Sequence, residues 1–236
     1  MEHTEKLLAA FADTREFVVL RNLYESASKQ LALKFEVLNS EFNVLYARNP
    51  IHHIESRVKS AESIAAKLAK RGLPLTIETA QENLNDIAGV RVICNYIDDV
   101  YRVAEMFERQ KDVEIVKRQD YIQTPNYNGY RSLHLDIRVP VYLSDRTEYV
   151  RAEIQIRTIA MDFWASLEHD IRYKADKSKL PKGINEEMYD AAGTDMVLAL
   201  LTRRIFALIS LLIEDLGRCI KNRSCESADC FARAVF

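Results

Sequence analysis

The feature that most constrains the fold is a pair of alternating runs within residues 120–158. In residues 132–139, and again in residues 151–158, an apolar side chain occupies every second position. The polar positions between these apolar side chains hold His134, Asp136, Arg138, Glu153, Gln155 and Arg157. A period of two is typical of β-strands that bury one face. The pattern therefore predicts two strands of a sheet whose second face is polar.

The loop directly before the first run joins a tight turn to an aromatic and a guanidinium group. Asn128 and Gly129, which favour turns, stand next to Tyr130 and Arg131. A ring and a guanidinium can both lie against a planar, charged ligand. A polar sheet face is often simply solvated. The loop beside this face nevertheless favours a ligand-binding site.

The rest of the chain predicts the elements around these two strands. Hydrophobic period and turn residues predict helices at residues 5–46 (two segments that meet near 26–28), 54–71, 78–84, from a cap at 98–99 to about 110, and 159–173, and strands at 90–97 and 113–118. The connections between strands are short, which favours a mixed, mostly antiparallel sheet over a doubly wound one. We therefore expect an α/β protein of the α+β type, in which helices flank a sheet of about five strands.

The helix expected at residues 54–71 carries a basic stripe opposite its apolar side. Lys59, Ser63, Lys67 and Lys70 form the stripe, and Arg57 stands near the start of the helix. Most such stripes are solvated faces. A row of ammonium groups with one hydroxyl also suits a polyphosphate chain, whose charges are spread along a line. The helix alone does not decide between these two interpretations.

Composition and charge argue against several classes of protein. The formal net charge of the 236 residues is −2, so no global field attracts DNA or an acidic membrane. Residues 196–213 are apolar, but Arg203 and Arg204 stand at their middle, where each charge would cost about 2.5–3.5 kcal/mol in a bilayer. The first residues lack the pattern of a secretory signal. We expect a cytoplasmic protein with free thiols and no membrane segment.

Two carboxylates are placed to act with these cations. Asp86 stands just before an expected strand, and Glu153 lies on the polar face of another. Mg²⁺ in proteins takes one or two carboxylates and completes its shell with water and phosphate oxygens. Two carboxylates from separate elements beside phosphate-binding cations are therefore the smallest set of groups for Mg²⁺-dependent phosphoryl chemistry.

Four stretches of sequence resemble the synthetase domain of the RelA/SpoT family. They are NPIHHIESRVKS (49–60), DIAGVRVICNYIDDVY (86–101), DYIQTPNYNGYRSLHL (120–135) and EIQIRTIAMDFWASLEHDIRYK (153–174). They follow the family's order, without a hydrolase region ahead of them, as in stand-alone small alarmone synthetases of the RelP type. The resemblance implies a nucleotidyltransferase-like synthetase domain at 49–176, an N-terminal helical region at 1–48, a C-terminal helical oligomerisation region at 177–221 and a loose tail at 222–236.

The resemblance also implies a reaction and the residues that perform it. The β,γ-pyrophosphate of ATP would move to the ribose 3′-oxygen of GDP or GTP, giving ppGpp or pppGpp and AMP. Asp86 and Glu153 would hold Mg²⁺, and Glu153 would also take the proton of the attacking hydroxyl. The ATP site would contain Arg57 and Arg91 around the adenine, with Lys59, Ser63 and Lys67 on the phosphates. The GDP or GTP site would contain Tyr130 stacked on the guanine, with Arg131, His134 and Gln155 around the acceptor.

Several points stay open on the sequence alone. Relatives usually carry a lysine where Asn126 stands, which leaves the preference between GDP and GTP undecided. A homotetramer is expected from the family, and control by alarmone or RNA is open. A hydrolase of alarmones would need partner histidines beside His169 and Asp170. A catalytically inactive nucleotide- or RNA-binding regulator with the same fold is the alternative, although two carboxylates beside phosphates favour an enzyme.

Overall fold

The computed structural model describes residues 14–171, 183, 186–187 and 189–193. It opens with one long helix, α2 (Arg15–Leu45), whose first turn is capped by the side chain of Thr14. The sequence predicted a break near Ser26 and Ser28, but the helix runs on without one. Both serine hydroxyls have partners that suit a continuous helix: the Ser26 hydroxyl donates to the Asn22 carbonyl one turn earlier, and the Ser28 hydroxyl donates to the Gly89 carbonyl of β2.

The centre of the fold is a five-stranded sheet with the strand order β1-β2-β5-β4-β3. Its strands are β1 (Ile51–Val58), β2 (Ala88–Cys94), β3 (Glu114–Asp120), β4 (Leu133–Tyr142) and β5 (Thr147–Thr158). β2 and β5 pair in parallel, and every other neighbouring pair is antiparallel. The predicted mixed, mostly antiparallel sheet is thus confirmed.

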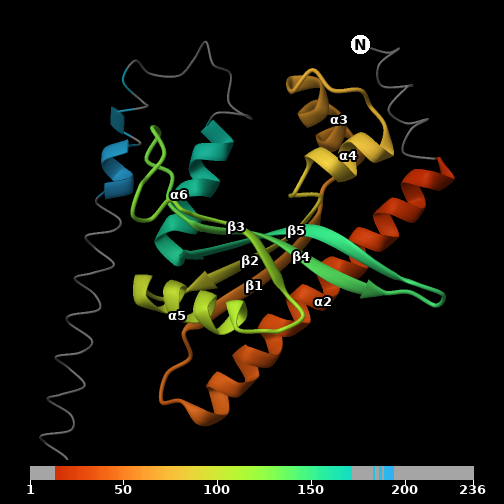
Figure 1. Ribbon diagram of the computed structural model, residues 1–236. Helices are drawn as coiled ribbons and strands as arrows, with labels where there is room; N and C mark the ends of the chain where they lie inside the picture. The colour runs from red at the N-terminus through yellow and green to blue at the C-terminus, as the bar shows by residue number, and fades with distance from the viewer. Residues whose placement is uncertain (1–13, 172–182, 184–185, 188, 194–236) are drawn as a thin grey trace, which may run out of the picture.

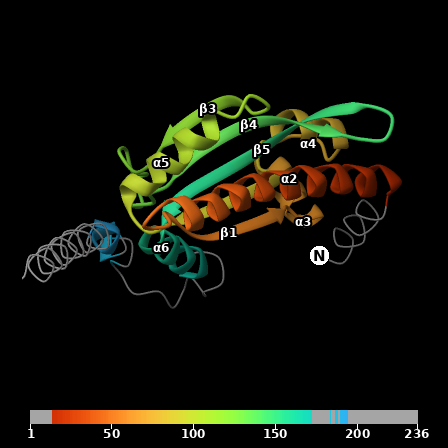
Figure 2. The same ribbon diagram turned by 90° about the horizontal axis from the view of Figure 1, so that it is seen from below.

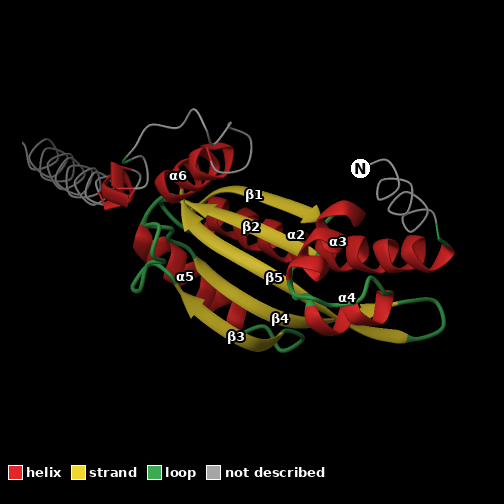
Figure 3. Ribbon diagram, turned by 90° about the horizontal axis from the view of Figure 1, so that it is seen from above, coloured by secondary structure: helices red, strands yellow, loops and turns green. Residues whose placement is uncertain are grey.

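Helices cover the two faces of the sheet unequally. α2 and α5 (Ile97–Glu108) lie on one face, where Phe35 of α2 stacks on Phe107 of α5 with ring centroids 4.6 Å apart (Figures 1 and 2). The other face has α3 (Ala61–Lys70) and α4 (Ile77–Asn83) near one end and α6 (Ile159–His169) near the other (Figures 1 and 3). The first face carries the hydrophobic core, which includes Leu135, Ile154 and Val92. The second is the polar face that the alternating runs predicted.

One expected helix is wrong over its first part. Residues 54–58 belong to the edge strand β1, which pairs antiparallel with β2, and the helix begins only at Ala61. Ser60 has extended backbone and its side chain accepts from the Ser63 N–H, so it caps the helix. Arg57 is therefore a strand residue, and Lys59 lies in the short connection to α3.

Some expectations concern residues outside the described part of the chain. These are the apolar run 196–213, most of the oligomerisation region 177–221, the tail 222–236 and the end of the last expected helix. Among the described residues, no helix is both long and apolar enough to cross a membrane.

Candidate active site

The register of the sheet brings the polar side chains of four strands into two rows. In the first row, Arg57 of β1 pairs with Gly89 of β2, which pairs with Glu153 of β5. In the second row, Arg91 of β2 lies between Glu55 of β1 and Gln155 of β5. His134 of β4 is the next partner of Gln155 in this row. Residues far apart in the sequence therefore face one area of the polar face.

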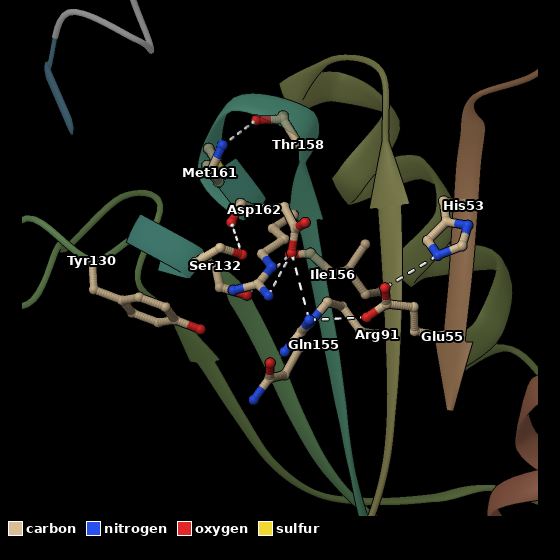
Figure 4. Close-up of polar contacts among 12 residues, drawn as sticks. His53, Glu55, Arg91, Tyr130, Ser132, Gln155, Ile156, Thr158, Met161 and Asp162 are labelled. Atoms are coloured by element: carbon tan, nitrogen blue, oxygen red, sulfur yellow. Dashed lines mark hydrogen bonds and ion pairs between the residues drawn. The ribbon is translucent and has the colours of Figure 1, made fainter. Parts of the chain in front are cut away.

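A pocket of about 230 Å³ opens over these rows. Three carboxylates and two guanidinium groups share its lining, which consists of Glu55, Ser56, Arg57, Asp86, Gly89, Val90, Arg91, Glu153 and Gln155. Figure 4 shows Arg91, Glu55 and Gln155 side by side on this part of the sheet. Guanidinium and carboxylate groups thus line the same small pocket.

Asp86 is held by two lysines that come from different places. Lys59 Nζ lies 2.8 Å and Lys67 Nζ 2.6 Å from the same oxygen, Oδ2. Burial raises the pKa of Asp86, but the hydrogen bonds from the two ammonium groups outweigh burial and hold this pKa below its usual value. The other oxygen, Oδ1, is buried and has no hydrogen-bond partner within the described structure. An ionised carboxylate with one unused oxygen is suited to bind a cation.

Glu153 is held by one side chain of the neighbouring strand β4 and by one side chain of its own strand β5. His134 Nδ1 lies 3.2 Å from Oε1, and Gln155 Nε2 donates to Oε2 at 2.6 Å. Burial raises the pKa of Glu153, yet the hydrogen bonds from His134 and Gln155 keep this pKa below its usual value. The Tyr130 hydroxyl lies 2.8 Å from His134 Nε2. A neutral imidazole can accept from Tyr130 and donate to Glu153, so the three side chains form one chain of hydrogen bonds.

The loop before β4 fixes Tyr130 through its turn. Gly129 has a φ of 88°, which favours glycine over residues with a side chain. A Cβ at this position would also lie only 3.0 Å from Ala192 Cβ, so the space around the turn favours glycine as well. The Tyr130 N–H donates to Asn128 Oδ1, and the Asn128 amide donates to Glu168 Oε1 at 3.0 Å. The loop is thereby tied to α6. The ring of Tyr130 lies among other rings, those of Tyr121, His134 and Trp164.

Comparison with known proteins agrees with this geometry. The family model described as "Region found in RelA / SpoT proteins" matches residues 56–178, which is more than half of the chain. GTP pyrophosphokinase YwaC of Bacillus subtilis (strain 168) is 48% identical over 190 residues, covering 80% of this chain and 89% of that protein. The chain belongs to the RelA/SpoT family.

Solved structures of this family share the fold. The crystal structure of small alarmone synthetase 2 from Bacillus subtilis superposes with a TM-score of 0.73 at 46% identity, covering 82% of this chain and 99% of that chain. The structure of small alarmone synthetase 1 from the same organism, bound to its product pppGpp, superposes with a TM-score of 0.76 at 29% identity. It covers 84% of this chain and 100% of the other.

The structure brings together most of the residues that the sequence singled out, but not two of them. Ser63 sits in the exposed first turn of α3, where its hydroxyl accepts from the Ser60 hydroxyl at 3.2 Å. Arg131 turns to its own loop, because its Nη1 donates to the Ile122 carbonyl at 2.9 Å. Neither residue lines the pocket, and in the described structure neither contacts Asp86 or Glu153 as Lys59, Lys67 and His134 do.

Other residues near the site were not predicted. Asn85 donates to Asp136 Oδ2 at 3.0 Å, which ties the segment carrying Asp86 across to β4. Arg157 of β5 lies 2.6 Å from Asp162 of α6. Asp136 and Arg157 share the polar face in the alternating pattern, so the sequence held a signal for them. It held none for Asp162, whose position depends on how α6 turns back over the sheet.

Proposed function

We propose that this chain is a GTP pyrophosphokinase that makes alarmones. It would transfer the β,γ-pyrophosphate of ATP to the ribose 3′-hydroxyl of GDP or GTP, releasing AMP and ppGpp or pppGpp. The observation that carries the proposal is the single pocket that contains both Asp86 and Glu153 together with two guanidinium groups. Family membership and the names of the relatives support the same reaction.

The donor site is proposed at Arg57, Arg91, Lys59, Lys67 and Ser63. The two guanidinium planes come from neighbouring strands and border one pocket, which suits an adenine held between them. Lys59 and Lys67 now share one oxygen of Asp86, so both ammonium groups already point at one spot. Phosphate oxygens of ATP entering there would replace that carboxylate oxygen as their partner.

The residues present fit a Mg²⁺ ion held between Asp86 and Glu153. Asp86 Oδ1 is buried without a hydrogen-bond partner within the described structure, and an oxygen in that state costs free energy unless a ligand uses it. Within the described ranges no three His, Cys, Asp or Glu side chains form a metal site. Two protein carboxylates are enough for Mg²⁺, which completes its shell with water and phosphate oxygens. When bound, Mg²⁺ would neutralise charge on the ATP phosphates as the pyrophosphate is transferred.

The acceptor site is proposed at Tyr130, Arg131, His134 and Gln155. Glu153 is ionised and oriented by His134 and Gln155, so it can take the proton of the 3′-hydroxyl. Most of the rate enhancement would come from holding the two nucleotides in line and from charge stabilisation, as in other phosphoryl transfers.

The remaining expectations for the whole chain stay proposals. We propose that residues 49–176 form the synthetase domain between an N-terminal helical region and a C-terminal oligomerisation region, and that the cytoplasmic enzyme is a homotetramer. Of the two alternatives, an alarmone hydrolase and an inactive regulator, the first can be compared with the structure. His169 and Asp170 lie at the exposed end of α6, away from the pocket, which argues against a hydrolase site there.

Analysis of the products tests this proposal. The purified chain is incubated with ATP, Mg²⁺ and either GDP or GTP, and the nucleotides are separated by ion exchange. We expect AMP and ppGpp or pppGpp in equal amounts, and no reaction when EDTA removes the metal. Nucleotide binding without any AMP would instead support the inactive regulator. With GDP and GTP mixed in equal amounts, the same assay measures the acceptor preference.

A further inference from the structure

Asp162 places one carboxylate oxygen between two arginines of the polar face. Its Oδ1 lies 2.6 Å from Nη2 of Arg157 and 3.7 Å from Nη1 of Arg91. Arg91 comes from β2 and Arg157 from β5, while Asp162 comes from the first turn of α6. Figure 4 shows Asp162 above Arg91, which also reaches Glu55 on its other side. One acidic side chain therefore contacts two cations from neighbouring strands.

The fold holds Asp162 in place firmly. β5 ends at Thr158, whose side chain accepts from the Met161 N–H at 3.3 Å and so starts α6 directly. Met161 and Trp164 are buried on either side of Asp162, and they anchor this turn. A carboxylate in the first turn of a helix is also favoured by the helix dipole. Asp162 is thus a fixed acidic partner for the two arginine side chains.

Arg91 belongs to the donor side of the site. It lines the pocket with Asp86 and Arg57, and its other ionic partner is Glu55 at 2.9 Å. The guanidinium of Arg91 can lie flat against an adenine only if its plane is held. Its Nε is buried and has no hydrogen-bond partner in the described part of the chain, so Glu55 and Asp162 hold it through Nη1 alone.

Arg157 lies beside the end of the loop that carries Tyr130, because Leu133, three residues after Tyr130, pairs with Ile156. It is 3% exposed, and its positive charge acts on the Tyr130 phenol, where it opposes the rise in pKa that burial causes. The ring of Trp164, two residues after Asp162, lies 6.4 Å from the ring of Tyr130. The first turns of α6 therefore touch Arg91 on one side and the surroundings of Tyr130 on the other.

The cluster depends on Asp162 for its charge balance. Arg157 is buried, and Asp162 is the acidic side chain with which it forms an ion pair in the described structure. A buried guanidinium that loses its partner is strongly destabilised in its position and moves or recruits another group. Loss of Asp162 would leave Arg91 to Glu55 alone and Arg157 without a carboxylate, so both would change their orientation.

We propose that Asp162 is a positioning residue that orients Arg91 for ATP and Arg157 for the guanine nucleotide, so that binding of both substrates depends on it. The inference rests on the proposed function, because it assigns the two arginines to donor and acceptor. It adds Asp162 and Arg157 to the site. Asp162 itself would touch neither nucleotide.

The test measures binding separately from turnover. Calorimetry gives the Kd of a non-cleavable ATP analogue, α,β-methylene ATP, and the Kd of GDP, each with the full chain and Mg²⁺. For Asp162→Asn we expect both Kd values to rise about fivefold or more. Asp162→Glu keeps the charge and should restore at least part of both affinities. The matched control is Glu55→Gln, which removes the other ionic partner of Arg91 and, on its second oxygen, a contact with His53, but no contact of Arg157. It should weaken the ATP analogue but leave GDP unchanged.

Three results would overturn the inference. One is an Asp162→Asn variant that binds both nucleotides as the wild type does. Another is a change in only one of the two Kd values. The third is loss of folding in both Asp162 variants, seen as melting below the assay temperature, since Asp162 would then serve the fold alone. Failure of the proposed function looks different, because wild-type protein would then form no AMP from ATP and GDP.

Discussion

The Glu153 carboxylate is the middle of a line of hydrogen bonds that runs from Tyr130 through His134 to Gln155. The contacts with His134 and Gln155 restrict the rotation of the Glu153 carboxylate, and their hydrogen bonds keep its pKa below the usual value, so that it stays ionised. A group that must accept a proton from a bound hydroxyl gains from such fixed geometry, because no reorganisation is then needed during the reaction. Tyr130, whose ring the sequence predicted to stack on guanine, thus also contacts His134 through its hydroxyl.

The hydroxyl of Tyr130 gives a prediction that sequence alone did not. Stacking depends on the ring, so Tyr130→Phe should leave the KM of the acceptor nearly unchanged. The lost hydrogen bond to His134 should lower kcat about three- to tenfold, which corresponds to about 1 kcal/mol. Steady-state kinetics with GDP as the varied substrate measure both constants. An unchanged kcat would mean that the line from Tyr130 to Glu153 does not serve catalysis.

Removing the whole ring should act on the acceptor instead. For Tyr130→Ala we expect the KM of GDP to rise about ten- to a hundredfold, since stacking of a base on an aromatic ring is worth about 1–3 kcal/mol. The KM of ATP should stay within a factor of two or three. Tyr127→Ala, in the same loop and 86% exposed, is the control. If both KM values rise together with a large fall in melting temperature, Tyr130 is a core residue.

At the scale of elements, α3 offers a matched pair of lysines. Lys67 contacts Asp86, whereas Lys70 lies one turn later and is exposed. Lys67→Ala should raise the KM of ATP about tenfold, because one charge-assisted hydrogen bond to phosphate is lost. The KM of GDP should change little, and Lys70→Ala should change neither constant. Equal effects of Lys67→Ala on both substrates would place α3 outside the donor site.

The elements also show what the sequence could reveal. β4 and β5 were predictable because each buries one face, so apolar side chains recur at every second position. β1 was not, because it is an edge strand with few buried residues. Its apolar side chains Ile51, Ile54 and Val58 are three and four positions apart, which is the spacing of a helix. Alternation carries no signal where neither face of a strand is fully covered.

The candidate site was predictable to the same extent. Glu153, Gln155 and His134 follow from the alternation, because they point to one face of neighbouring strands. Asp162 and Asn85 do not, since their contacts with Arg157 and Asp136 depend on how loops and helices return over the sheet. The convergence of Lys59 and Lys67 on one oxygen is also a property of the fold, as one lies in a connection and the other on a helix.

At the scale of the whole molecule, the surface of α2 predicts an assembly. Several large apolar side chains are exposed along this helix, namely Val18, Val19, Leu33, Val37, Val44 and Leu45. Contiguous exposed apolar surface usually marks an interface. We expect light scattering to give a mass about four times the 27.2 kDa of one chain. A stable monomer at micromolar concentration would contradict the proposed tetramer.

The most direct measurement follows the label of [γ-³²P]ATP in the presence of GDP and Mg²⁺. The account predicts that the label appears in the 3′-diphosphate of ppGpp, with one unlabelled AMP for each product molecule. It also predicts that Glu153→Gln and Asp86→Ala each retain less than about one hundredth of wild-type turnover, a loss of at least ~2.7 kcal/mol, and still fold. Label in free phosphate, or a variant that keeps more turnover than this, would contradict the proposed chemistry of the pocket.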